Sequence, residues 1–201
     1  MEAVIPVIGV LAGLISLTAF PPYIFDMFKG TTRPERASWF IWTVLSIIAF
    51  TTQIAEGARW SLILIGVQTF GITLTFLLSL KFGYGGLKKR DIVSLIVASF
   101  GLVLWGITNQ PILALVLVII IDIAGAWLTV YKAYRDPESE TEITWWLDSV
   151  ASSLGVIAVG AITPSLLLYP GYLVLANFSV VVGIRLGRMR KRSSVKIAKN
   201  Q

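Results

Sequence analysis

Long apolar stretches separated by short polar segments dominate the chain. Residues 3–25, 37–55 and 60–80 contain no charged side chain, and each stretch can cross the roughly 30 Å hydrocarbon layer as a helix of about 20 residues. The later run from Pro111 to Ile121 is apolar at every position except Pro111 itself, so it lacks the alternation of a transmembrane β-strand. The pattern predicts an all-α integral membrane protein.

Six segments that gather charge, glycine and proline divide the apolar stretches, and they predict seven transmembrane helices. The expected helices cover residues 3–27, 37–55, 60–81, 91–107, 111–133, 143–162 and 166–187. If the loops alternate between two sides, sixteen of the 17 Lys and Arg residues fall on one side and Arg59 alone on the other. The positive-inside rule then predicts a multi-pass protein of the plasma membrane, N-terminus outside and C-terminus cytoplasmic.

Composition narrows the function classes. The chain has no cysteine and no histidine, which removes thiolate chemistry and the usual general base and zinc ligand. We therefore expect no enzyme activity, no cofactor and no metal site. The net charge of +6 is typical of nucleic-acid binding, but seven basic residues lie in the last 17 positions and are better explained as an orientation signal. The expected partners are the lipid bilayer and a small-molecule solute, with no nucleic acid.

The chain also contains an internal repeat. Phe25, Lys29 and Trp39 are matched by Tyr131, Arg135 and Trp145, an offset of 106 positions (145 minus 39). An odd number of crossings separates the copies, so they are expected to have the same orientation. The predicted architecture has two parallel three-helix bundles plus a linker helix (3+1+3). Its parts are a first bundle at 1–82, a linker helix within 83–110, a second bundle at 111–187 and a basic tail at 188–201.

This organisation resembles the SWEET and PQ-loop group of transporters. The residues that carry the resemblance are Pro21-Pro22-Tyr23-Ile24, Lys29-Gly30 and the segment 33–42. Pro22 stands where the family has its namesake Gln, and the second half has Trp127-Leu128 at the equivalent place. The resemblance implies transport of a small polar solute, with Asn177 at the position of a pocket Asn, its counterpart near Gln68 and Thr69, and no clear match to the family's pocket Trp.

Few polar side chains lie within the predicted helices, and these are the candidate substrate-binding residues. Asp122 lies in the middle of an apolar helix, where a carboxylate is either functional or a neutral packing residue. We expect it to face a cavity that also touches Asn177 or Gln68, and either proton coupling or binding of a cationic group would use it. Asp148 is closer to a helix end, where a structural, gating or binding role fits equally well. Gln53 and Thr69 complete the candidate set; Gln53, like Gln68 and Asn177, either lines the pathway or joins helices.

Other residues are candidates for a hinge or gate near the cytoplasmic side. Pro21 and Pro22 are expected either to end the first helix or to form a hinge. Asp26, Trp42 and Trp146 lie near the cytoplasmic boundary and are assigned to the gate. The basic loop 33–36 and the acidic loop 136–142 occupy equivalent places in the two halves, and we expect them to pair across the cytoplasmic mouth.

These features favour a membrane transporter that moves a sugar-like or other small metabolite by alternating access between the two bundles. A receptor or scaffold protein of the PQ-loop type is the first alternative, and a pathway lined only by apolar residues would favour it. An ion channel is the second, and a continuous wet pore beside Asp122 would favour it. The sequence is compatible with a homo-oligomer.

Overall fold

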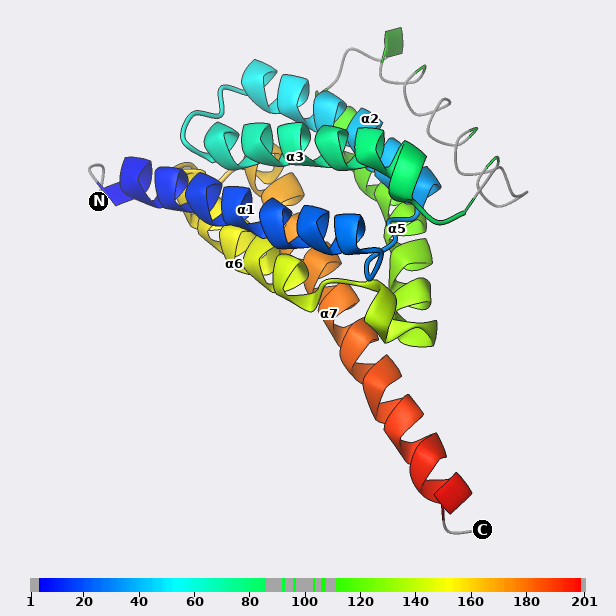
Figure 1. Ribbon diagram of the computed structural model, residues 1–201. Coiled ribbons are helices and arrows are strands. Elements are labelled where there is room, and N and C mark those ends of the chain that lie inside the picture. The colour runs from blue at the N-terminus through cyan, green and yellow to red at the C-terminus, as the bar shows by residue number, and fades with distance from the viewer. Residues whose placement is uncertain are drawn as a thin grey trace.

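The computed structural model describes residues 4–85, 111–199 and the isolated positions 92, 96, 103, 106 and 107. These residues form α-helices joined by short loops, as the sequence predicted (Figure 1). The elements are α1 (Val4–Lys29), α2 (Arg36–Ala55), α3 (Ser61–Phe82), α5 (Pro111–Arg135), the 3₁₀ helix η1 (Pro137–Ser139), α6 (Glu142–Ala158) and α7 (Pro164–Lys199).

Five of the six described helices are long and apolar enough to cross a membrane, namely α1, α2, α3 and the segments Val116–Arg135 of α5 and Leu166–Ser193 of α7. The described residues therefore show five candidate spans instead of seven. With 17 residues, α6 is about 26 Å long and somewhat short, and the predicted linker helix within 83–110 lies outside the described residues. Large apolar side chains such as Phe70, Trp127 and Leu175 are at least 66% exposed. The chain is a multi-pass membrane protein whose outer surface suits lipid.

Two predicted boundaries need correction, and one of the two roles expected of Pro21 and Pro22 is excluded. The helix expected to reach residue 162 ends at Ala158, because Gly160 takes a positive φ of 74° and Pro164 begins the next helix. The last helix was expected to stop at 187 but continues to Lys199, since no proline interrupts the basic tail. The prolines do not end the first helix, because α1 continues through both Pro21 and Pro22.

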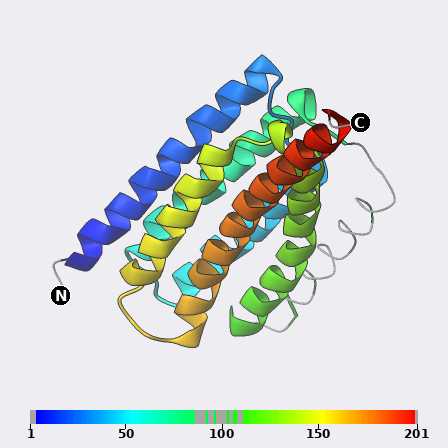
Figure 2. The ribbon, with the colours of Figure 1, turned by 90° about the horizontal axis from the view of Figure 1, so that it is seen from below.

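The six helices form a closed ring. Helix α1 packs against α3 and α6, α2 packs against α3 and α5, and α7 packs against α5 and α6. The order around the ring is therefore α1, α3, α2, α5, α7, α6, and Figure 2 shows α7 lying beside both α5 and α6. Exchanging α1, α2 and α3 with α5, α6 and α7 reproduces the same neighbours. This is the arrangement that two equivalent three-helix units would give.

Contacts between the two units also occur in matching pairs. The hydroxyl of Ser38 on α2 donates to the carbonyl of Gly125 on α5, at 3.3 Å. The hydroxyl of Thr144 on α6 donates to the carbonyl of Ala19 on α1, at 2.8 Å. The two donors, Ser38 and Thr144, are 106 positions apart (144 minus 38). The two acceptors, Ala19 and Gly125, are also 106 positions apart (125 minus 19). The α2–α5 interface and the α6–α1 interface therefore contain equivalent hydrogen bonds.

Small residues let α7 approach α5 closely. A Cβ atom at Gly187 would lie 2.6 Å from the carbonyl oxygen of Tyr134, and one at Gly183 would lie 3.0 Å from the carbonyl oxygen of Val130. Glycines four residues apart lie on one face of a helix, and this spacing is common where membrane helices pack backbone to backbone. The second unit is thus held together by direct contact between two helix backbones.

Candidate solute site

A buried cavity of about 60 Å³ lies at the centre of the ring. Every described helix contributes to its lining, including Phe20 of α1, Trp42 of α2, Gln68 of α3, Asp122 of α5, Asp148 of α6 and Asn177 of α7. The volume suits a few water molecules, at roughly 10–15 Å³ each, and is far below the roughly 300–1,000 Å³ of drug-sized ligand pockets.

Asp122 lies where the sequence predicted, beside a cavity that it shares with Gln68 and Asn177. Its residue is 6% exposed, and its Oδ1 atom has no hydrogen-bond partner among the described residues. The Tyr172 hydroxyl and the Trp42 indole are neighbouring polar groups. Buried polar atoms are normally paired, so an unpaired carboxylate oxygen beside a cavity marks a position where a ligand can bind.

Asp148 also lines the cavity, but its carboxylate is engaged. The hydroxyl of Ser16 on α1 donates to Asp148 Oδ1 at 2.7 Å, and this bond is buried. Gln68 is a further polar neighbour of the same carboxylate. Since Ser16 belongs to the first unit and Asp148 to the second, the bond joins the two units at the depth of the cavity.

The internal repeat relates these two carboxylates in an unexpected way. The offset of 106 places Asp122 at the position of Ser16 (122 minus 16) and Asp148 at the position of Trp42 (148 minus 42). The α1–α6 interface thus combines Ser16 with Asp148, while the α2–α5 interface combines Trp42 with Asp122. Each interface carries one carboxylate, but only the first supplies it with a hydroxyl donor.

The remaining predicted binding residues separate into two groups. The side-chain amide of Asn177 donates to the Ser152 hydroxyl at 3.4 Å and lines the cavity. Thr69 occupies the equivalent place in the first unit and donates to the Ser46 carbonyl at 3.2 Å, but it is not among the lining residues. Gln53 is fully buried and also lies outside the lining. The structure therefore brings together Asp122, Asp148, Gln68 and Asn177.

Three tryptophans, Trp39, Trp42 and Trp145, form a wall of the cavity that we call the tryptophan cluster. Their ring centroids are 5.3 Å apart for Trp39 and Trp42, 5.9 Å for Trp42 and Trp145, and 6.4 Å for Trp39 and Trp145. In the sequence, Trp39 and Trp145 served only to indicate the repeat. Their spacing from other lining residues also indicates that they face the cavity, because Trp39 and Trp42, like Trp145 and Asp148, are three positions apart and share a helix face.

The predicted gate residues do not all lie at the cavity. Trp42 belongs to the tryptophan cluster, but Trp146 faces away from the cavity. Its ring packs against Phe178 with centroids 5.5 Å apart, and its indole donates to Glu142 at 3.3 Å. Its neighbour Trp145 lines the cavity and Trp146 does not, and the gate role of Trp146 stays a prediction.

Asp26 and two threonines join the loops at the end of the ring that carries η1, which we call the basic end. The hydroxyls of Thr32 and Thr141 lie 2.7 Å apart, and Thr141 also donates to Asp26 at 2.9 Å. Thr32 follows α1 and Thr141 precedes α6. The two units are therefore hydrogen-bonded to each other beyond the tryptophan cluster.

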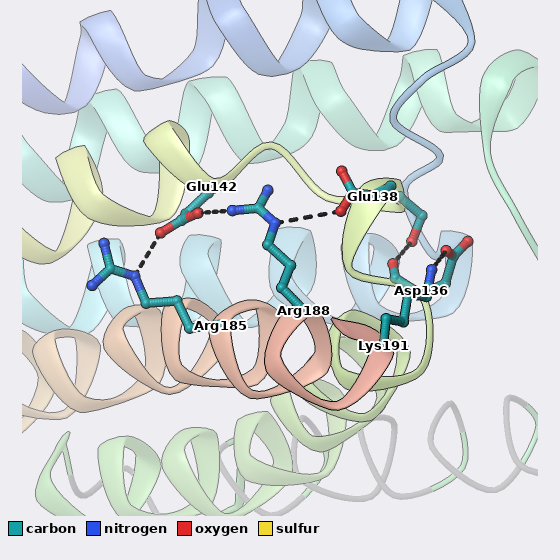
Figure 3. A network of polar contacts seen from close by, with 7 residues as sticks. Asp136, Glu138, Glu142, Arg185, Arg188 and Lys191 are labelled. Carbon is teal, nitrogen blue, oxygen red and sulfur yellow. Dashed lines mark hydrogen bonds and ion pairs between the residues drawn. The ribbon is translucent and has the colours of Figure 1, made fainter. Parts of the chain in front are cut away.

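Acidic side chains of the loop 136–142 form ion pairs with α7 (Figure 3), while the basic loop 33–36 contacts this loop through a backbone hydrogen bond from the Arg33 N–H to the Ser139 carbonyl, at 3.4 Å. Glu142 accepts from Arg185 at 2.8 Å and from Arg188, and Lys191 contacts Asp136 at 3.0 Å. The expected partner Arg36 instead donates to backbone carbonyls, at 2.9 and 3.1 Å. The expected pairing of charged side chains between the two loops is wrong, because the basic side chains of α7 lie beside the acidic loop instead.

These arginines also change the acidity of Glu142, which begins α6 outside the five candidate spans. Burial raises the pKa of its carboxyl, but the hydrogen bonds from Arg185 and Arg188 outweigh that effect. The pKa of Glu142 therefore lies below the ordinary glutamate value. The charged form of Glu142 is favoured in the folded protein.

Comparisons with protein-family models, with curated proteins and with solved structures find no match for this chain. The fold and the site define its class as a multi-pass membrane protein with a central cavity that two carboxylates and two amides line among apolar side chains. Any conclusion about function is drawn from the residues of that cavity.

Proposed function

We propose that this protein is a membrane transporter that carries a small polar solute by alternating access between two three-helix bundles. One observation carries the proposal: a central cavity with two buried carboxylates lies where the two units meet. The full architecture that we propose is the 3+1+3 arrangement of seven helices, with the linker helix within 83–110 and the N-terminus outside. The ring order and the paired hydrogen bonds of Ser38 and Thr144 support an internal repeat of this kind.

Apolar and aromatic side chains enclose the cavity on both sides. Toward the basic end, Trp39 and Trp145 pack with Tyr23, and at the opposite end Leu45 and Ile65 belong to a second buried cluster. A carrier needs a conformation in which its site is closed to both sides. The apolar and aromatic clusters at both ends therefore favour a carrier over a channel, and the carboxylates and amides of the cavity favour a carrier over a purely structural receptor.

The absence of native cysteine makes alternating access directly testable without knowing the solute. Ala126 lines the cavity and is 8% exposed, so Ala126→Cys places one thiol at the site. A membrane-impermeant methanethiosulfonate reagent is applied to right-side-out and to inside-out vesicles. We expect modification from both sides, because each conformation opens the cavity to one of them.

A second step closes one side deliberately. The hydroxyls of Thr32 and Thr141 are 2.7 Å apart, which suits a disulfide between cysteines at these positions. With this pair oxidised, modification of Cys at position 126 should cease from the basic end and continue from the other. The single variants Thr32→Cys and Thr141→Cys, treated with the same oxidant, serve as controls. A thiol that reacts from neither side, or a cross-link that leaves both rates unchanged, would contradict the proposal.

A further inference from the structure

We propose that the solute recognised by this cavity is a small organic cation, an amine or a guanidinium compound, whose charge is paired with Asp122 and whose apolar face lies on the tryptophan cluster. The inference rests on the proposed function, because it assigns a ligand class to the same cavity. Three properties of the cavity support it: the charge of its lining, the aromatic wall beside Asp122, and its volume.

The charges of the lining are unbalanced. Asp122 and Asp148 are the acidic residues among the lining side chains, and the lining that the structure describes includes no Lys or Arg. An ionised carboxylate within the membrane costs several kcal/mol unless an opposite charge or a polar cavity compensates it. The protein itself offers no counter-ion to Asp122 in the lining, and a bound cation would supply one.

The two carboxylates are not equally available. Asp148 Oδ1 accepts a 2.7 Å hydrogen bond from Ser16, whereas Asp122 Oδ1 has no partner among the described residues. The repeat explains the difference, because Asp122 itself occupies the position equivalent to Ser16. Asp122 is therefore the carboxylate with a free acceptor for an N–H donor, and Asp148 is a positioning residue at the contact between the units.

The wall beside Asp122 selects the kind of cation. Trp42 is a neighbour of the Asp122 carboxylate, and the tryptophan cluster continues from it with centroid distances of 5.3 to 6.4 Å. Aromatic faces attract organic cations, and Trp does so most strongly. Hard metal ions instead prefer a shell of six or more oxygen ligands. An aromatic wall with one unpaired carboxylate oxygen thus fits an alkylammonium or guanidinium group better than a metal ion.

The volume of the cavity limits the size of the ligand. A cavity of about 60 Å³ is far below the roughly 300–1,000 Å³ of drug-sized ligand pockets and suits a small ligand. A sugar would also need many hydrogen-bond partners, while most of the lining is apolar or aromatic. Size and polarity therefore both favour a compact cation over a neutral sugar.

The test measures binding by the thermal unfolding of the purified full-length chain in detergent. The probes are guanidinium and methylammonium chloride, with urea and methanol as neutral counterparts of similar size and sodium chloride at equal ionic strength. We expect the two organic cations to raise the unfolding temperature by a few degrees, with a saturable dependence on concentration, and the other three probes to give no saturable shift. Equal shifts with sodium chloride or with urea would overturn the assignment.

Two variants locate the effect. Asp122→Asn should abolish the shift, and Glu138→Gln, which removes a carboxylate that is 68% exposed outside the cavity, should retain it. If Asp122→Asn does not fold, Asp122→Ser replaces it, since the equivalent position on α1 is Ser16. A shift that persists in the Asp122 variant would refute the proposal. Binding is measured here without transport, so failure of the cation assignment leaves the cysteine test unaffected, and failure of alternating access leaves this binding test unaffected.

Discussion

The close contact of α7 with α5 leads to a quantitative prediction for Gly187→Ala. The new Cβ atom would lie 2.6 Å from the carbonyl oxygen of Tyr134 and 2.9 Å from that of Ala133. An ordinary contact begins near 3.4 Å, so the helices must separate by about 0.8 Å (3.4 minus 2.6) at this point. Both neighbours are backbone atoms and cannot rotate aside. Overpacking of this kind costs about 1–3 kcal/mol.

Helix propensity acts in the opposite direction, because Ala is favoured over Gly by about 0.5–1 kcal/mol within a helix. The expected net loss for Gly187→Ala is therefore up to about 2.5 kcal/mol (3 minus 0.5). Gly171→Ala is the matched control on the same helix, since a Cβ atom there would meet no described atom within 4 Å. It should leave stability unchanged or raise it by up to about 1 kcal/mol.

The measurement is equilibrium unfolding of the purified chain in mixed micelles, followed by circular dichroism. Wild type, Gly187→Ala and Gly171→Ala are compared under identical conditions. If the two variants are equally stable, α7 does not pack against α5 as closely as described, and the argument from Cβ contact fails.

Two further predictions concern single hydrogen bonds and charges. Ser16→Ala should destabilise the protein by about 1–3 kcal/mol, because it removes a buried donor to the Asp148 carboxylate, whereas Thr18→Ala, whose hydroxyl bonds within its own helix, should have a much smaller effect in the same unfolding assay. The lowered pKa of Glu142 means that its contribution is complete above the ordinary value of about 4.3 and is lost as the pH falls through the lowered pKa. The stability difference between wild type and Glu142→Gln should therefore be constant from pH 7 to 5 and shrink below pH 4, and a difference that does not shrink would contradict the role of the Arg188 pair.

The sequence predicted the features that depend on local composition. Apolar stretches without charge predicted the helices, and the depth of Asp122 in such a stretch predicted its place beside the cavity. The pattern could not decide which face of a helix turns inward when both faces are apolar. Trp145 and Trp146 are adjacent, and only packing against the other unit places the first at the cavity and the second outside.

Contacts between distant segments were also beyond the sequence. The acidic loop was expected to meet Arg33 and Arg36, because they occupy the equivalent loop of the other half. Its partners on α7 are Arg185, Arg188 and Lys191, and the last two lie in the part of α7 that extends past residue 187. A charge pattern reveals that a loop needs partners, but the choice of partner depends on how far a neighbouring helix continues.

The polar contacts within the second unit differ in kind from those between the two units. The ion pairs of Glu142 and Asp136 with α7 lie inside the second unit, so they hold α6 and α7 together as one body. Across the division, the described polar contacts are hydrogen bonds. Ser38 and Thr32 make neutral hydroxyl bonds, each of which contributes about 1 kcal/mol or less in a membrane protein, while Ser16 and Thr141 donate to the carboxylates of Asp148 and Asp26, and Lys132 donates to the carbonyl of Arg33. Separation of the two halves would therefore break hydrogen bonds of both kinds and leave the ion pairs between α7 and the acidic loop intact.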